Sequence, residues 1–136
     1  MKHPKLSKLV SDFSAFCAEL GEVRTLHTHP MNDGGAHADF FDDKFHYIGT
    51  ERGVEIYHRE TSDQREALYW FLSDVVGDLA IAYARKNVRP GVDFRRELFD
   101  KEIELMSRLD TNWGVRKKLE VQDILRASPY VDIRDD

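Results

Sequence analysis

The sequence predicts a single α+β domain, dominated by helix, in which a short three-stranded antiparallel meander packs against about four helices. In several segments apolar residues recur every three or four positions, which is the period of an amphipathic helix. Between residues 36 and 56 the period changes to two, as in a half-buried strand. The chain has 136 residues and no internal repeat or linker-like stretch, so we expect one domain over residues 1–136.

The first predicted helix runs from Leu6 to Leu20, where apolar side chains gather on one face and Gly21 follows as a stop signal. Pro30 and the Asn-Asp-Gly-Gly run at residues 32–35 then predict an irregular loop.

The meander follows, with strands expected at residues 36–41, 45–49 and 54–56. Asp42 and Asp43 are expected to form the first turn. The second turn ends in Gly53, because a tight hairpin needs a residue that adopts the left-handed conformation at this point.

A long helix is expected to begin at a capping box formed by Thr61 and Gln64 and to run through Asn87. Its polar residues fall on one narrow stripe, so most of its surface is expected to be buried. Asp74 and Asp78 lie in its middle, where charges are costly in lipid, and we expect a buried helix and no membrane partner.

Two further helices complete the chain. Asp93 can cap a third helix that continues to Leu109. Thr111 or Asn112 can cap a fourth helix, which runs to Arg126.

Charge and cysteine content restrict the function and the compartment. The net charge is −5, which disfavours binding to a phosphate backbone, so no nucleic-acid partner is expected. The only cysteine, Cys17, excludes an intrachain disulfide and is typical of a reducing cytosol. The N-terminal residues do not resemble a secretory signal, and we expect a cytoplasmic protein.

The stretch TLHTHPMNDGGAHADF, residues 25–40, has the residue types of a metal site. His27 and His29 would point to the same side of an extended segment, and with His37 they suggest a small metal-dependent hydrolase as the alternative function. No metal-binding motif of defined spacing supports it, and turn and strand formation explain the aspartates and glycines. Serine nucleophile and phosphate-loop motifs are also absent, so we expect no enzyme, no metal and no cofactor.

Two other features suggest contacts. Trp70 borders the polar stripe of the long helix, so it is expected to be partly exposed and to anchor an interface. Arg95 and Arg96 lie at the positive end of the third helix, where cations are unfavourable. We expect one of them to pair with a carboxylate of another element, with Glu51 or Glu66 as the candidates.

The segments FHYIGTERGVEIYHRETSDQREALYWFLSDV, DFRRELFDKEIELMSRLDTNW and ILRASPYVD, in this order, resemble immunity-protein family 63 of bacterial polymorphic toxin systems. The resemblance extends over roughly residues 33–132. It implies a protein that binds a cognate toxin domain and neutralises it. The positions that match the family's pattern are Glu51, Arg52, Gly53, Tyr69, Trp70, Asp93, Phe94, Arg95, Arg96 and Trp113.

Apart from Trp70, we expect the pattern residues to serve hairpin geometry, core packing and an ion pair. The toxin contact is expected at an acidic loop, because carboxylates can occupy a basic cleft. This loop comprises Asp33, Asp39, Asp42 and Asp43. A regulatory binding module is a third possibility, and the oligomeric state is left open.

Overall fold

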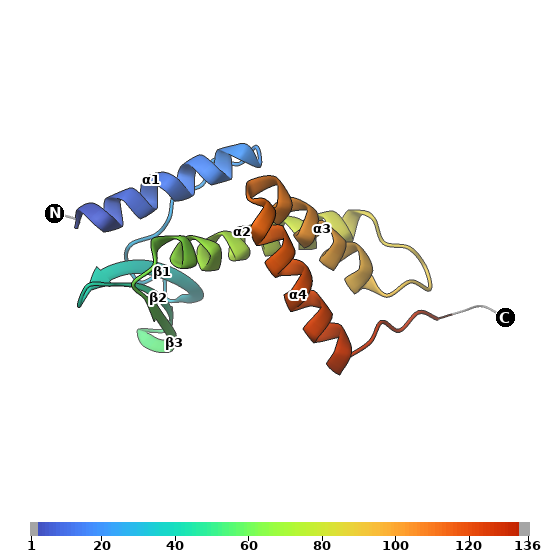
Figure 1. Ribbon diagram of the computed structural model, residues 1–136. Helices are drawn as coiled ribbons and strands as arrows, with labels where there is room; N and C mark the ends of the chain where they lie inside the picture. The colour runs from blue at the N-terminus through green and yellow to red at the C-terminus, as the bar shows by residue number, and fades with distance from the viewer. Residues whose placement is uncertain (1–2, 134–136) are drawn as a thin grey trace. The chain divides into compact units, whose positions relative to one another are not determined.

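A computed structural model describes residues 3–133, and within this range it contains four helices and one three-stranded sheet (Figure 1). The predicted α+β class is confirmed. The elements are α1 (Pro4–Glu19), β1 (Asp33–Phe41), β2 (Lys44–Glu51), β3 (Val54–Thr61), α2 (Gln64–Lys86), α3 (Phe94–Leu109) and α4 (Thr111–Ala127).

Contacts between residues divide the chain into two compact units, Met1–Ser73 and Asp74–Asp136, and the boundary falls within α2. Each unit is described in turn. That the chain is a single domain stays a prediction.

The sheet of the first unit is an antiparallel meander in the order β1-β2-β3. Each hairpin has a two-residue turn in which both residues have positive φ: 52° and 60° at Asp42 and Asp43, and 52° and 78° at Arg52 and Gly53. This geometry matches the right-handed twist of the flanking strands. Both turn predictions are confirmed.

Each hairpin also contains a shift in strand register. β1 begins at Asp33, three residues before the predicted start, and its pairing with β2 is irregular up to Ala36. In the second hairpin the pairing shifts between Gly49 and Thr50, which leaves Ile56 on β3 without a partner residue. Such a bulge reverses the faces to which the following side chains point.

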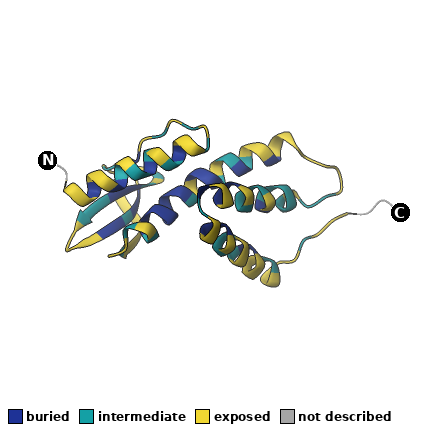
Figure 2. Cartoon of the chain, turned by 45° about the horizontal axis from the view of Figure 1, so that its top comes forward, coloured by how far each residue is buried: buried dark blue, intermediate teal, exposed yellow. Residues whose placement is uncertain are grey.

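The core of the first unit lies on the face of the sheet that α1 and the beginning of α2 cover (Figures 1 and 2). The Tyr47 ring on β2 lies 4.9 Å from the Phe71 ring and 6.2 Å from the Trp70 ring. The buried residues of the two helices are Leu6, Leu9, Phe13 and Cys17 of α1 and residues 67–72 of α2. The predicted first helix is confirmed within two residues at its start and one at its end.

Helix α2 is not capped as predicted. Asp63 caps it, because its Oδ1 accepts hydrogen bonds from the backbone N–H groups of Arg65 and Glu66 at 2.9 and 3.4 Å. Thr61 is still a strand residue paired with Phe45, so it cannot cap the helix. The predicted capping box of Thr61 and Gln64 is therefore wrong.

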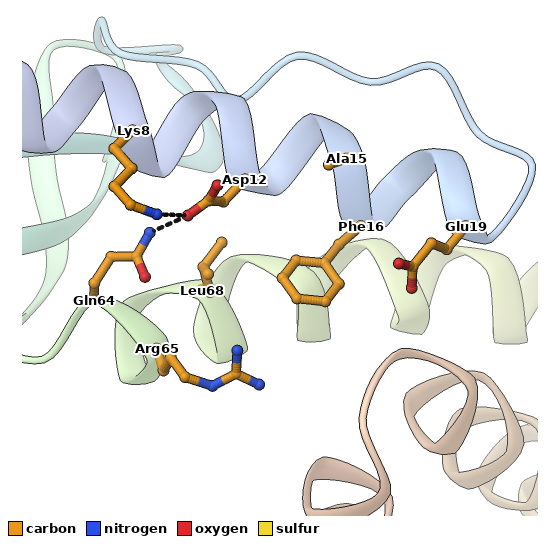
Figure 3. A pocket seen from close by; sticks show the side chains of 8 residues that line it. All are labelled: Lys8, Asp12, Ala15, Phe16, Glu19, Gln64, Arg65 and Leu68. Carbon is orange, nitrogen blue, oxygen red and sulfur yellow. Dashed lines mark hydrogen bonds and ion pairs between the residues drawn. The ribbon is translucent and has the colours of Figure 1, made fainter.

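Gln64 instead joins α2 to α1, in an open groove between these helices (Figure 3). Its side-chain amide donates to Asp12 at 2.6 Å, and Lys8 donates to the same Asp12 oxygen at 2.6 Å. The Lys8 ammonium holds the pKa of the Asp12 carboxyl below its usual range, although burial opposes this. The polar groups of the groove thus serve the packing of α1 on α2.

By length and composition alone, α2 could also cross a membrane. In the structure, 56% of its most apolar 18-residue stretch is buried. The core helix of a soluble protein passes the same test, so this is weak evidence for a membrane span.

The second unit contains the end of α2, together with α3 and α4, which pack closely against each other. Gly114 makes this approach possible, because a Cβ at this position would lie 2.1 Å from Ser107 Oγ and 2.9 Å from Ser107 Cα. Asp93 caps α3 as predicted. The cap of α4 is Asp110, which accepts from the Trp113 N–H at 3.1 Å, so the prediction of Thr111 or Asn112 is wrong by one or two positions.

Candidate functional site

The turn between β1 and β2 carries exposed carboxylates at the tip of a hairpin. Asp42 and Asp43 are both exposed. Neither side chain forms a hydrogen bond or an ion pair with another residue that the structure describes. Phe41, beside them, is 43% exposed, and its ring stacks on that of His46 at 3.6 Å. Aspartate tolerates the left-handed backbone better than most residues, which explains how two of them can form the turn. The hairpin turn, as we call Phe41, Asp42 and Asp43, therefore presents an aromatic ring next to two negative charges.

The predicted acidic loop is not one loop. Asp39 lies on β1 two residues before Phe41 and accepts a hydrogen bond from the Phe40 N–H at 2.8 Å. Asp33 begins the same strand at its other end, so at about 3.3 Å per residue roughly 25–30 Å separate it from Asp42. Its Oδ1 accepts from the Gly35 N–H at 2.8 Å in a local turn. The structure thus brings together three of the four aspartates and leaves Asp33 apart.

Trp70 is buried, with 8% of its surface exposed, so the expectation of a partly exposed tryptophan is wrong. Its indole N–H donates to Glu66 Oε1 at 3.0 Å, and the Arg59 guanidinium lies 4.1 Å from the centre of its ring. Glu66 lies on the same helix and Arg59 on β3. Trp70 therefore connects α2 to Arg59 of β3. Its predicted role in partner binding depended on an exposed side chain, which the structure does not show.

The pattern residues of the first unit serve the fold. Arg52 and Gly53 form the β2–β3 turn, and the Gly53 N–H donates to Asn32 Oδ1 at 2.9 Å. Glu51, the last residue of β2, pairs with Val54 across this turn and is exposed. Tyr69 is buried in α2.

In the second unit, Asp93 is the centre of a network that joins the start of α3 to residues 128–133. Arg95 donates to both Asp93 carboxylate oxygens, at 3.3 and 2.9 Å, and to the backbone carbonyls of Ser128 and Pro129 at 2.9 Å each. The Val131 N–H donates to Asp93 Oδ2 at 2.8 Å. These hydrogen bonds, above all those from Arg95, hold the pKa of the Asp93 carboxyl far below its usual range.

Arg96 pairs with Asp132, with nitrogen–oxygen distances of 2.7 to 3.1 Å. The predicted ion-pair partners, Glu51 and Glu66, are therefore wrong: Arg95 and Arg96 find their carboxylates in their own unit. Trp113 is buried as expected for a core residue, whereas Phe94, the first residue of α3, is 41% exposed.

The three histidines of the alternative hydrolase do not form a metal-binding group in the described part of the chain. His27 and His29 are exposed in the segment before β1, where the His27 carbonyl accepts from the Ala38 N–H at 2.8 Å. His37 is buried on β1, and this burial lowers the pKa of its imidazole against the opposing effect of Asp39.

Another group of potential ligands was missed by the sequence analysis. His46 on β2 and His58 and Glu60 on β3 place one ligand atom each within 4.8 Å of one another. His46 is buried, with 2% exposed, and the other two are exposed. The Lys44 ammonium, hydrogen-bonded to Glu60 at 3.2 Å, holds the pKa of that carboxyl below its usual range. The sequence analysis placed His46 in the second predicted strand but ended the third at residue 56, so His58 and Glu60 lay outside the predicted hairpin.

The fold and this arrangement are those of a small α+β protein, in which most of the pattern residues form turns, caps and core and an acidic turn faces solvent. The model of one protein family, described as Immunity protein 63, matches residues 42–123, which is more than half of the chain. The chain therefore belongs to the Immunity protein 63 family, and the resemblance seen in its sequence is confirmed.

The match begins at Asp42, so it includes β2, β3, α2 and α3 and most of α4, while α1 and β1 lie before it. It is shorter at both ends than the resemblance over residues 33–132. No curated protein and no solved structure gives a significant match to this chain. As a member of this family, the chain is an immunity protein directed against a toxin.

Proposed function

We propose that this protein binds a cognate toxin domain in the cytoplasm and neutralises it, without catalysis, through a surface centred on the hairpin turn. Membership of the family supports the toxin as the partner. The observation that carries the surface is the exposure of Asp42 and Asp43, without partners among the described residues, beside exposed Phe41.

The physical reason is a combination of charge and pre-organisation. Two adjacent carboxylates on a chain of net charge −5 attract a basic partner surface and accelerate the encounter with it. A two-residue turn between paired strands is already ordered, so binding costs little conformational entropy. An aromatic ring beside the charges supplies the apolar contact that dominates many interfaces.

Cys17 supports an intracellular site of action. It is the only cysteine of the chain and a free thiol, as is typical of proteins in a reducing compartment, and it is buried, which raises its pKa.

The test begins with affinity capture from producing cells, followed by purification of the co-captured toxin domain. The affinity of Asp42→Asn/Asp43→Asn for this domain is then compared with that of the wild type. Asparagine also tolerates positive φ, so the double variant removes the charges and keeps the turn. We expect the affinity to fall about tenfold or more, with much of the loss in the association rate, and protection of cells from the toxin to weaken in parallel.

The matched control is Asp100→Asn/Asp123→Asn, which removes two exposed carboxylates from α3 and α4 and causes the same change in net charge. It should leave the affinity unchanged. Equal losses in the two double variants would show a general charge effect, and no loss in either would refute the hairpin turn as the contact. Asp33→Asn, tested alone, reports whether the contact extends to the other end of β1.

A further inference from the structure

We propose that His46, His58 and Glu60 form a binding site for one divalent transition-metal ion of the zinc type. The site would lie on the β2–β3 hairpin, on the face of the sheet opposite to the one packed on the helices. This inference rests on the geometry of these side chains and does not depend on the proposed function.

The bulge in this hairpin brings the three side chains to one face. With the register that the structure shows, His46 pairs directly with Glu60, and His58 pairs with Ile48, two residues further along β2. The imidazoles of His46 and His58 are therefore diagonal neighbours, with ring centres 5.0 Å apart. Phe41, stacked on His46 at 3.6 Å, fixes the plane of the buried ring.

The hydrogen bonds of the two histidines identify which ring nitrogens carry hydrogen. His46 Nε2 lies 3.0 Å from the Phe41 carbonyl oxygen, which can only accept, so Nε2 is the donor. His58 Nδ1 lies 2.7 Å from a Glu55 carboxylate oxygen and donates to it by the same argument. A neutral imidazole has hydrogen on only one nitrogen, so the lone pairs are left on His46 Nδ1 and His58 Nε2.

These two lone-pair nitrogens face each other at 2.7 Å. Two acceptors at this distance repel unless a cation lies between them. The cation can be a proton, which would make the pair share one positive charge, or a metal ion. The surroundings distinguish between these two cations.

Glu60 favours the metal. Its Oε2 lies 3.7 Å from His46 Nδ1, too far for a hydrogen bond but within reach of an ion held between the rings. Two nitrogens and one carboxylate oxygen are a ligand set that suits zinc, and the exposure of His58 and Glu60 leaves a further position open to solvent. A shared proton would be attracted by this carboxylate only across 3.7 Å, whereas a metal ion can bond to all three ligand atoms at once.

Each ligand also has a partner in the outer shell, as functional metal sites have. Glu55 orients His58, the Phe41 carbonyl orients His46, and Lys44 holds the second oxygen of Glu60 at 3.2 Å. The ammonium of Lys44 opposes a cation, but the carboxylates of Glu55 and Glu60 together outweigh it.

The rearrangement required is small. Zinc–nitrogen bonds of about 2.0–2.1 Å at a tetrahedral angle place two ligand nitrogens about 3.4 Å apart, so the pair would open by roughly 0.7 Å from its separation of 2.7 Å. His58 lies on the exposed strand β3 and can move by this distance, while His46 stays in place.

The test uses the full chain, purified without a histidine tag and freed of metal with a chelator. Zn²⁺ is titrated by calorimetry, and Co²⁺ is titrated with its visible absorption as a readout of coordination geometry. We expect one ion per chain and micromolar or tighter affinity for Zn²⁺. His58→Gln and Glu60→Gln should each weaken binding by tenfold or more, and Glu55→Gln, which removes the outer-shell carboxylate, by about 10- to 100-fold.

The matched control is His29→Gln, which removes an exposed histidine outside the cluster and should leave the affinity unchanged. All substituted positions are exposed, so the variants should fold, and circular dichroism checks that they do. The proposal is overturned if the wild type takes up no Zn²⁺ below millimolar concentration. It is equally overturned if folded His58→Gln and Glu60→Gln bind Zn²⁺ as the wild type does.

Discussion

Gly49 provides a quantitative test of the hairpin geometry. It lies in β2 opposite Tyr57 of β3, and the tyrosine ring covers the glycine. A Cβ added at Gly49 would lie 1.9 Å from Cζ of this ring and 2.1 and 2.4 Å from its two Cε atoms. Because carbon atoms in contact are about 3.5 Å apart, the Gly49→Ala substitution must displace the ring by roughly 1.5 Å.

The cost follows from what the ring contacts. The Tyr57 hydroxyl donates to the Gly34 carbonyl at 2.7 Å, and losing such a hydrogen bond costs about 0.5–1.5 kcal/mol. The ring also lies 5.6 Å from that of Tyr47, a contact worth about 0.5–1.5 kcal/mol. Overpacking adds about 1–3 kcal/mol. Alanine regains about 0.4–1 kcal/mol through the unfolded state, so we expect a net destabilisation of about 1–5 kcal/mol.

The assay is urea unfolding followed by circular dichroism and by tryptophan fluorescence, in a Trp113→Phe background so that Trp70 reports the first unit alone. The same substitution is then made in a Tyr57→Ala background, where the clash is gone. Gly49→Ala should there cost less than about 0.5 kcal/mol. A similar cost in both backgrounds, or no cost in either, would refute the account of the Gly49–Tyr57 pair.

Three further predictions concern stability. Gly114→Ala should destabilise the second unit by about 1–3 kcal/mol in urea unfolding, because the added Cβ would meet Ser107. The higher helix propensity of alanine opposes this effect, and a more stable variant would contradict the close approach of α3 and α4. Because burial lowers the pKa of His37, its contribution to stability is present above about pH 6.5 and is lost as pH falls toward the folded-state pKa. Thermal melts should show that His37→Gln flattens this loss and that the control His27→Gln, at an exposed histidine, does not. Because hydrogen bonds lower the pKa of Asp93, its contribution to stability is present above about pH 4 and is lost on further acidification. Thermal melts of Asp93→Ala should therefore lose less stability between pH 4 and lower pH than the wild type does. An equal loss would show that the network with the tail does not form.

Features set by neighbouring residues were predictable from the sequence. Hydrophobic periodicity located the helices, the change of period on either side of Asp42 and Asp43 located the first turn, and the left-handed preference of Gly53 located the second. The predictions of helix caps were less accurate. Several polar residues lie near each helix start, and the path of the backbone decides which of them reaches the free N–H groups. Thus Asp63 and Asp110 are the caps instead of their neighbours.

Features that depend on register or on distant partners were not predictable. In a regular hairpin that starts from the Glu51–Val54 pair and has no bulge, His46 would lie opposite Arg59. His58 would then point to the other face of the sheet. The extra residue at Ile56 shifts the pairing, so that His46 and His58 share a face. The ion pair of Arg96 likewise depends on Asp132, 36 residues away and fixed by the path of the tail.

The backbone of the hairpin turn restricts how it can change during evolution. Positive φ at Asp42 and Asp43 costs most residues about 1 kcal/mol or more, while glycine, asparagine and aspartate accept it. Substitutions among these three residue types therefore change the charge at the two positions and keep the turn. Such substitutions adjust the charge of this tip stepwise between −2 and 0 without refolding, so the toxin contact proposed above could change its charge at little cost in stability.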